Sequence, residues 1–160
     1  MQLINRQNKK RIAAIFLLWL MAFCHFSIIT HFSSQPATDS AMTSGNLLDK
    51  ILEIFLGDKM NEMDAEAHEI IHNILRKTAH FTNFLILGFI YIMFAETYQG
   101  KLYVNSMKAV LICGLTAAML DETHQYFVPG RSAEITDVCI DFSGFFAGCI
   151  LYCGLKKGFK

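Results

Sequence analysis

The stretch IAAIFLLWLMAFCHFSIIT, Ile12–Thr30, decides the fold class of this chain. It contains one histidine and no formally charged residue. A helix needs roughly 20 mostly apolar residues to cross a bilayer, because each residue advances it by about 1.5 Å. The stretch meets this requirement alone, and it is longer than the apolar region of about 7–15 residues in a cleaved signal peptide. We therefore expect an uncleaved membrane-spanning helix.

The rest of the chain is apolar in blocks. Of its 160 residues, 53% are hydrophobic and only 18% are charged, against about 25% charged residues in soluble domains. Soluble core helices are the alternative, because two of the later blocks reach spanning length only with a polar turn included. We predict an all-α integral membrane protein, a four-transmembrane-helix bundle forming a single domain over 1–160. The expected spans are about 12–30, 79–97, 106–124 and 135–155.

The predicted external loop, 31–78, is expected to be partly helical. Leu47, Ile51 and Phe55 recur at helical spacing, with charged residues on the other face, and predict a short amphipathic helix. Asp64 is a good N-cap for a second helix, which would run directly into the second span.

The positive charges predict the orientation. Nine of the 14 Lys and Arg residues lie before the first span, between the second and third, and after the fourth, and five lie on the other side. The positive-inside rule then places both termini in the cytoplasm of a multi-pass protein. The formal net charge is zero, which argues against a nucleic-acid-binding protein.

Two motifs have simple packing interpretations. Gly144 and Gly148 form a G-x-x-x-G pattern that would let the fourth helix approach a neighbour closely. All five cysteines fall inside the predicted spans, Cys149 and Cys153 on one helix face, so they indicate buried packing rather than a disulfide framework.

His68-Glu69-Ile70-Ile71-His72 matches the zinc-protease motif H-E-x-x-H. Two histidines four residues apart share a helix face and could bind one metal ion, with Glu69 as a base. The motif has no obvious third ligand, however, and Glu69 also suits a solvated helix face. We interpret the match as incidental.

The stronger pattern is a layer of polar residues at the external ends of all four predicted spans. Antiparallel threading places these residues at one depth, and ionisable groups within a span usually mark a functional site or an internal pairing. The layer is assembled from Ser33, Ser34, Gln35, Lys77, His80, Asp121, Glu122, His124, Gln125, Arg131, Glu134 and Asp137, with Asp141 one turn deeper.

Helical spacing suggests which of these side chains face inward. Asp121 and Glu122 point about 100° apart, so we do not expect both to face one cavity fully. The predicted inward set is His80, Asp121, His124 and Asp137, and Asp141 shares a face with Asp137. Within the layer, two cations, Lys77 and Arg131, would nearly balance three anions, Asp121, Glu122 and Asp137. A structural salt-bridge network and a ligand or catalytic site both remain open interpretations.

Several motifs in order along the chain resemble the VanZ-like family. They are Phe-Ser-Ser-Gln-Pro at 32–36, Arg-Lys-Thr-Ala-His-Phe at 76–81, Leu-Gly at 87–88, Asp-Glu-Thr-His-Gln at 121–125, Phe-Val-Pro-Gly-Arg at 127–131 and Asp137. The resemblance covers roughly residues 12–155. It implies a small bacterial protein of the cytoplasmic membrane, with a named member associated with resistance to teicoplanin, a lipid-tailed glycopeptide.

Two function classes follow from this resemblance. One is a non-catalytic envelope protein that binds lipid-linked or lipid-tailed molecules at the outer leaflet. The other is a membrane-embedded hydrolase or transferase acting on a lipid-linked envelope substrate, in which histidine and aspartate act as acid and base or hold a divalent metal. The catalytic candidates are His80, His124, Asp121 and Asp137. The ligand-binding candidates are Ser33, Ser34, Gln35, Lys77, Glu122, Gln125 and Arg131. No cofactor is identified by the sequence.

Overall fold

The computed structural model of the protein describes residues 2–36 and 64–158, together with positions 42, 45, 50 and 54. All regular structure within these residues is helical: α1 (Gln2–Ser33), α3 (Ala65–Gln99), α4 (Val104–Tyr126) and α5 (Ile135–Gly158). Each of the four is long and apolar enough to cross a membrane, which confirms the predicted all-α class. The amphipathic helix predicted around 47–55 lies outside the described residues, apart from Lys50 and Ile54.

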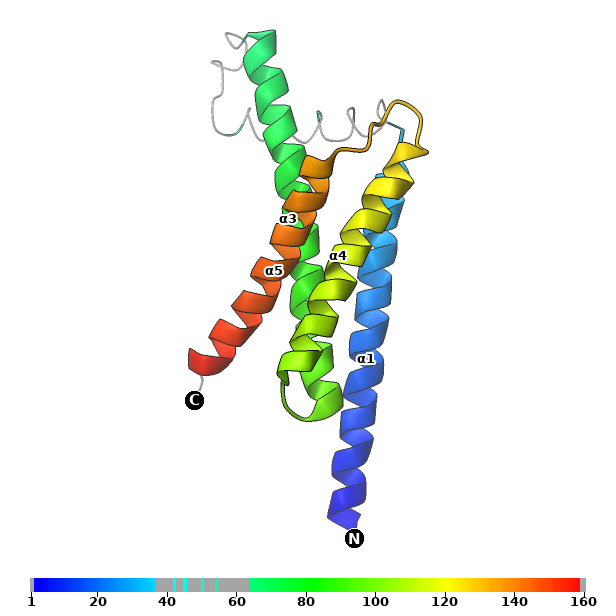
Figure 1. Cartoon of the computed structure of the whole chain (residues 1–160), viewed down its shortest axis with the longest axis vertical. Helices are drawn as coiled ribbons and strands as arrows, with labels where there is room; N and C mark the ends of the chain where they lie inside the picture. The colour runs from blue at the N-terminus through cyan, green and yellow to red at the C-terminus, as the bar shows by residue number, and fades with distance from the viewer. Residues whose placement is uncertain are drawn as a thin grey trace.

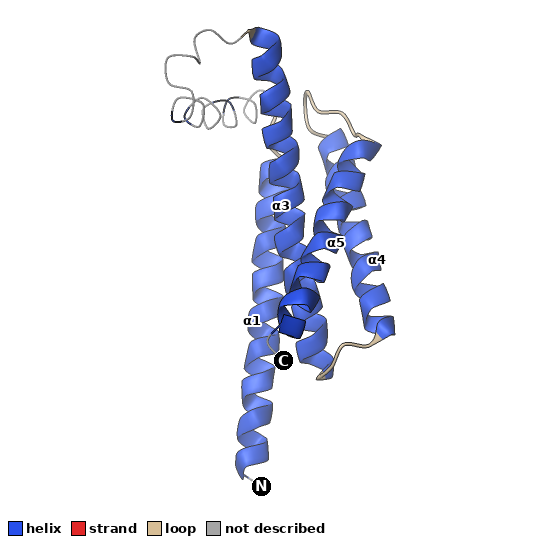
Figure 2. Ribbon diagram, turned by 90° about the vertical axis from the view of Figure 1, so that its left-hand side faces the viewer, coloured by secondary structure: helices blue, strands red, loops and turns tan. Residues whose placement is uncertain are grey.

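The four helices form an antiparallel bundle with two distinct ends (Figure 1). The N-terminus, the C-terminus and the α3–α4 connection lie at one end, here called the terminal end. The α4–α5 loop lies at the opposite end, here called the loop end. Helix α3 contacts each of the other three helices, and Figure 2 shows α1 running beside it.

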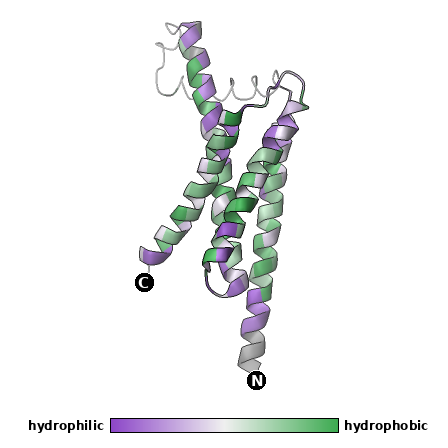
Figure 3. Ribbon diagram, in the orientation of Figure 1, coloured by the Kyte–Doolittle hydropathy of each residue, from purple (hydrophilic) through white to green (hydrophobic). Residues whose placement is uncertain are grey.

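The surface of the bundle is apolar, and charged side chains lie in its interior beside an apolar core. Phe16, Trp19, Ile112 and Ile150 are all at least half exposed, and Figure 3 shows apolar residues along the middle of every helix. Asp141, by contrast, is fully buried. A soluble protein rarely exposes so large an apolar surface, so this distribution fits a bundle surrounded by lipid.

The local sequence accounts for both ends of α3. Asp64 is the N-cap, and its side chain accepts a hydrogen bond from the Ala67 backbone N–H at 2.7 Å. Gly100 ends the helix with φ at +82°, a backbone conformation that favours glycine. The predicted start at Asp64 and the continuous run into the second span are therefore confirmed.

Helices α3 and α5 are in direct backbone contact, and glycines make this possible. A Cβ atom at Gly144 would overlap the carbonyl oxygen of Phe81, and one at Gly148 would overlap that of Leu85. Gly88 provides the reciprocal space on α3, against the carbonyl group of Phe145. The G-x-x-x-G motif of α5 thus forms the close contact that the sequence predicts, and α3 is the neighbour.

The other two helices pack around this pair. Gly114 of α4 leaves space for the ring of Phe145, which is fully buried. At the terminal end, Arg11 of α1 donates hydrogen bonds to the carbonyl oxygens of Thr97 and Tyr98. Further along α1, the His25 ring contacts the Asn83 carbonyl oxygen at 2.8 Å.

The glycine contact generates a stability prediction. Gly144→Ala should force α3 and α5 apart, because the new methyl group has no space beside the Phe81 backbone. We expect the free energy of unfolding in detergent to fall by about 1–3 kcal/mol, the usual cost of overpacking a core. Gly154→Ala, on the same helix but with no atom within 4 Å of the added group, is the matched control. Equal melting temperatures for the two variants would disprove the contact.

Candidate functional site

The loop end of the bundle contains a buried layer of polar side chains contributed by α1, α4 and α5. Charged and amide groups are rarely buried unless they are paired or functional. The buried members of this layer are Ser33, Asp121, Glu122, Gln125, Asp137 and Asp141. The predicted concentration of polar residues at this depth is therefore present in the structure.

Two of these groups, Asp121 and Asp141, converge at the centre with the partly buried His80 of α3. His80 Nδ1 of α3 lies 3.2 Å from Asp141 Oδ1 of α5. Asp121 of α4 completes the group, and ligand atoms of all three residues lie within 4.8 Å of one another. The second carboxylate oxygen of Asp141, Oδ2, is buried without a hydrogen-bond partner. We call His80, Asp121 and Asp141 the central triad.

The close contact between α3 and α5 positions two members of the triad. Phe81, whose carbonyl group lies against Gly144, directly follows His80. Gly144 lies three residues after Asp141, on the same side of α5. One of the close backbone contacts between the two helices therefore lies within one turn of the His80–Asp141 contact.

A chain of hydrogen bonds connects the triad to the end of α1. Gln125 Nε2 donates to Asp121 Oδ2 at 3.0 Å, and Gln125 Oε1 accepts from Arg131 Nη1 at 3.0 Å. Arg131 also donates from Nε to the Gln35 carbonyl oxygen at 3.0 Å and from Nη2 to that of Phe32 at 3.3 Å. Arg131 thus reaches Asp121 through Gln125, and it fastens the α4–α5 loop to α1.

The two neighbouring carboxylates of α4 serve different partners, as their helical spacing predicts. Asp121 bonds Gln125, whereas Glu122 Oε1 accepts from the backbone N–H of Glu134 at 2.6 Å, just before α5 begins. The other oxygen of Glu122, Oε2, is buried without a hydrogen-bond partner.

A cationic group lies at the edge of the layer. Arg76 Nη2 and Lys77 Nζ each lie 3.8 Å from a carboxylate oxygen of Asp137. Their side chains are 36% and 39% exposed, against 8% for Asp137. Burial, followed by the positive charge of Arg76, lowers the pKa of the Arg131 guanidinium below its ordinary value. Arg76 and Arg131 are therefore close enough to repel each other, and an anion near them would relieve that repulsion.

The predicted inward placement of His124 is wrong. Its side chain is exposed, and its Nε2 lies 2.9 Å from Ser34 Oγ at the end of α1. The three other members of the predicted set, His80, Asp121 and Asp137, are buried or partly buried. The residue that takes the central place is Asp141, which the sequence placed one turn deeper than Asp137 but not among the site residues.

The H-E-x-x-H motif lies on the first two turns of α3, away from the central triad in sequence. Glu69 is exposed, and the His68 side chain lies outside the part of the chain that the structure describes. Among the described side chains, the possible metal ligands that lie close together in a group of three are those of the central triad. The interpretation of the motif as incidental stays a prediction.

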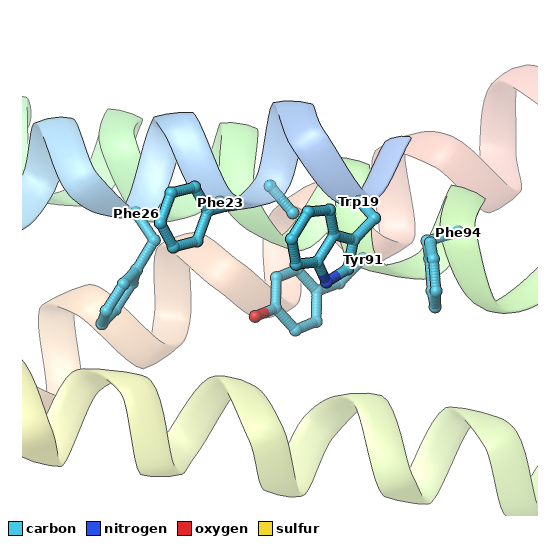
Figure 4. A pocket seen from close by; sticks show the side chains of 6 residues that line it. Trp19, Phe23, Phe26, Tyr91 and Phe94 are labelled. Atoms are coloured by element: carbon cyan, nitrogen blue, oxygen red, sulfur yellow. The ribbon is translucent and has the colours of Figure 1, made fainter. Parts of the chain in front are cut away.

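A separate apolar cavity of about 210 Å³ lies along α1 and α3. Figure 4 shows the rings of Trp19, Phe23, Phe26, Tyr91 and Phe94 around it, extending from these two helices on the side of α4. The cavity carries no charged residue, so any ligand there would bind through apolar contacts.

These features define an integral membrane protein with a buried polar site at one end of a four-helix bundle. The chain belongs to the VanZ/LLP1 family, whose model matches residues 14–156 and thus nearly the whole chain. No curated protein and no solved structure matches it. The family resemblance predicted from the motifs is therefore confirmed.

The hydrogen bonds from Arg131 to the end of α1 generate the second prediction. Arg131→Gln removes charge-assisted hydrogen bonds to two carbonyl groups of the α1 end, and such bonds contribute about 1.5–3 kcal/mol each. We expect a loss of about 2–3 kcal/mol in the free energy of unfolding, less than two full contributions because the bond to the Phe32 carbonyl oxygen is exposed to solvent. Lys108→Gln, an exposed position on α4 at the terminal end, serves as the control. A melting temperature for Arg131→Gln equal to that of Lys108→Gln would show that the loop is held by other contacts.

Proposed function

We propose that this VanZ/LLP1 protein acts at the outer face of the bacterial cytoplasmic membrane. There its polar layer binds the headgroup of a lipid-linked or lipid-tailed molecule. The observation that carries the proposal is a pair of unsatisfied carboxylate oxygens: Glu122 Oε2 and Asp141 Oδ2 are buried without hydrogen-bond partners. Burying a polar atom without a partner is costly. Carboxylate oxygens accept hydrogen bonds, so the hydroxyl or amide groups of a headgroup, or a bound cation, would supply the missing contacts.

The charge at the edge of the layer favours an anionic headgroup. Arg76 and Lys77 share one carboxylate, that of Asp137, and Arg131 is within electrostatic reach of Arg76. Two of these cations are partly exposed at the edge of the layer, and Arg and Lys commonly bind phosphate and carboxylate groups. Phosphate-linked envelope lipids and lipid-tailed glycopeptides both carry such groups.

The apolar surface next to the layer favours a ligand with a tail. Phe32, Tyr126 and Phe127 are all at least half exposed at the loop end, where aromatic residues typically meet the membrane interface. The aromatic cavity between α1 and α3 offers apolar contacts deeper in the bundle. A headgroup in the layer and a tail along these helices would suit an amphiphile approaching from the outer leaflet.

A second candidate function is a membrane-embedded hydrolase or transferase acting on such a lipid-linked substrate. The contact of 3.2 Å between His80 Nδ1 and Asp141 Oδ1 favours it. A carboxylate in this position orients an imidazole and stabilises its protonated form, as general acid–base catalysis requires. His80 would then transfer the proton, and Asp141 would position the His80 ring.

The first functional prediction concerns binding. The double variant Arg76→Gln/Lys77→Gln should bind polyprenyl phosphate in nanodiscs at least about tenfold more weakly than the wild type. This corresponds to about 1.4 kcal/mol, a modest loss for two cations facing one phosphate. The double variant Lys101→Gln/Lys108→Gln, at the terminal end, keeps the net charge change equal and should bind like the wild type. Equal binding by the two double variants would refute the headgroup site.

Binding should also have a cellular counterpart. Cells expressing the wild type should survive higher teicoplanin concentrations than cells expressing Arg76→Gln/Lys77→Gln at equal membrane abundance. A glycopeptide without an acyl tail should not separate the two strains. Separation by both antibiotics would argue against recognition of the tail.

The orientation gives a further prediction. Both termini share one end of the bundle (Figure 1), and the positive-inside rule places that end in the cytoplasm. A reporter fused after Lys160 should be active in the cytoplasm, and one inserted between residues 57 and 64 should be active outside. A cytoplasmic signal from the inserted reporter would reverse the orientation and exclude an outward-facing site.

A further inference from the structure

The central triad is short of positive charge. Asp121 and Asp141 are 3% and 0% exposed, so neither carboxylate is compensated by water. The amide of Gln125 donates to Asp121 but carries no charge. Arg131 is bonded to Gln125 and to the α1 end, and Arg76 and Lys77 lie beside Asp137. Among the described side chains, His80 is the basic group that contacts Asp141. Even when it is protonated, its one positive charge cannot balance two buried carboxylates.

The geometry of the triad suits one ion. An imidazole nitrogen and two carboxylate oxygens, from three helices, lie within 4.8 Å of one another. Asp141 Oδ2 is fully buried and has no hydrogen-bond partner, so it has a free lone pair for a ligand. This orphan oxygen is an observation separate from the clustering of the three side chains, because a closed salt-bridge network would have used it.

We propose that His80, Asp121 and Asp141 bind a single divalent transition-metal cation, of which Zn²⁺ and Mn²⁺ are the best matches. A mixed set of one nitrogen and two oxygen ligands suits these ions, whereas Mg²⁺ and Ca²⁺ favour oxygen ligands alone. Three protein ligands leave a coordination position open. The proposal deepens the proposed function, because an open position could be taken by a phosphate or carboxylate oxygen of the headgroup.

Gln125 extends the site as a supporting residue. Its amide donates to Asp121 Oδ2 at 3.0 Å, and Arg131 fixes the orientation of that amide by donating to its oxygen. Such partners outside the ligand set orient the ligands, and their loss typically weakens metal binding by about 10–100-fold. The hydrogen bonds from the α1 end through Arg131 and Gln125 would thus hold the Asp121 carboxylate in the orientation that binds the metal.

The experiment uses full-length protein in detergent, treated with a chelator and titrated with Zn²⁺ and then with Mn²⁺, without any lipid. The wild type should bind about one ion per chain, and the ion should raise its melting temperature, because binding to the native state stabilises it. His80→Gln and Asp141→Asn should bind at least about 100-fold more weakly. Glu96→Gln, which changes a buried carboxylate at the terminal end, should bind like the wild type, as should His68→Gln/His72→Gln.

Stability without metal distinguishes an ion site from a structural ion pair. If the triad is built for a cation, metal-free Asp141→Asn should melt no lower than the metal-free wild type, because it removes an uncompensated buried charge. If His80 and Asp141 form only a structural pair, the variant should melt lower and no ion should bind to the wild type. Loss of binding in His68→Gln/His72→Gln alone would also overturn the proposal.

The design keeps the outcomes separate. If a triad variant fails to reach the membrane, the wild-type measurement is sufficient by itself. Saturable metal binding with a raised melting temperature supports the site, and no metal binding by the wild type overturns it. The lipid titration of the proposed function, repeated with chelator present, reports on the headgroup site independently. Metal binding without lipid binding would then refute the proposed function and leave the triad as a metal site.

Discussion

The structure depends on the direct backbone contact between α3 and α5. Lipid tails are as apolar as the helix surfaces, so membrane helices associate through close packing of small residues rather than through a hydrophobic driving force. Gly88, Gly144 and Gly148 provide that packing, since a side chain at any of them would overlap the facing backbone. The contact holds His80 against Asp141 within one helical turn of Gly144, so the glycines that build the fold also build the centre of the site.

Charge is distributed unequally between the two ends of the bundle. At the terminal end, Glu96 is satisfied by the hydroxyl group of Tyr152 and by Lys156. At the loop end, Glu122 and Asp141 each retain a buried oxygen without a hydrogen-bond partner. A purely structural network would be expected to resemble the first arrangement. The unpaired carboxylate oxygens, with partly exposed cations around them, are typical of a binding site rather than of a closed structural network.

The sequence was sufficient for the fold class, the start of α3 at Asp64 and the depth of the polar layer, because apolar block length, capping chemistry and antiparallel threading determine them. It did not show which residues of the layer lie at its centre and which lie at its edge. Helical spacing shows which side chains share a face, but not how each helix is rotated. That rotation turns Asp141 inward and His124 toward Ser34. The route from Arg131 to Asp121 through Gln125 also depends on the path of the α4–α5 loop, which no periodicity describes.

The central claim is that the glycine contact assembles a cation site from His80, Asp121 and Asp141. X-ray absorption spectroscopy of the zinc-loaded protein tests it most directly, because it identifies the ligand atoms. The account predicts one imidazole, with oxygen atoms completing the shell and no sulfur. Two imidazoles would instead indicate the histidine pair at 68 and 72, and sulfur would indicate the cysteines of the spans. Either result would contradict the account.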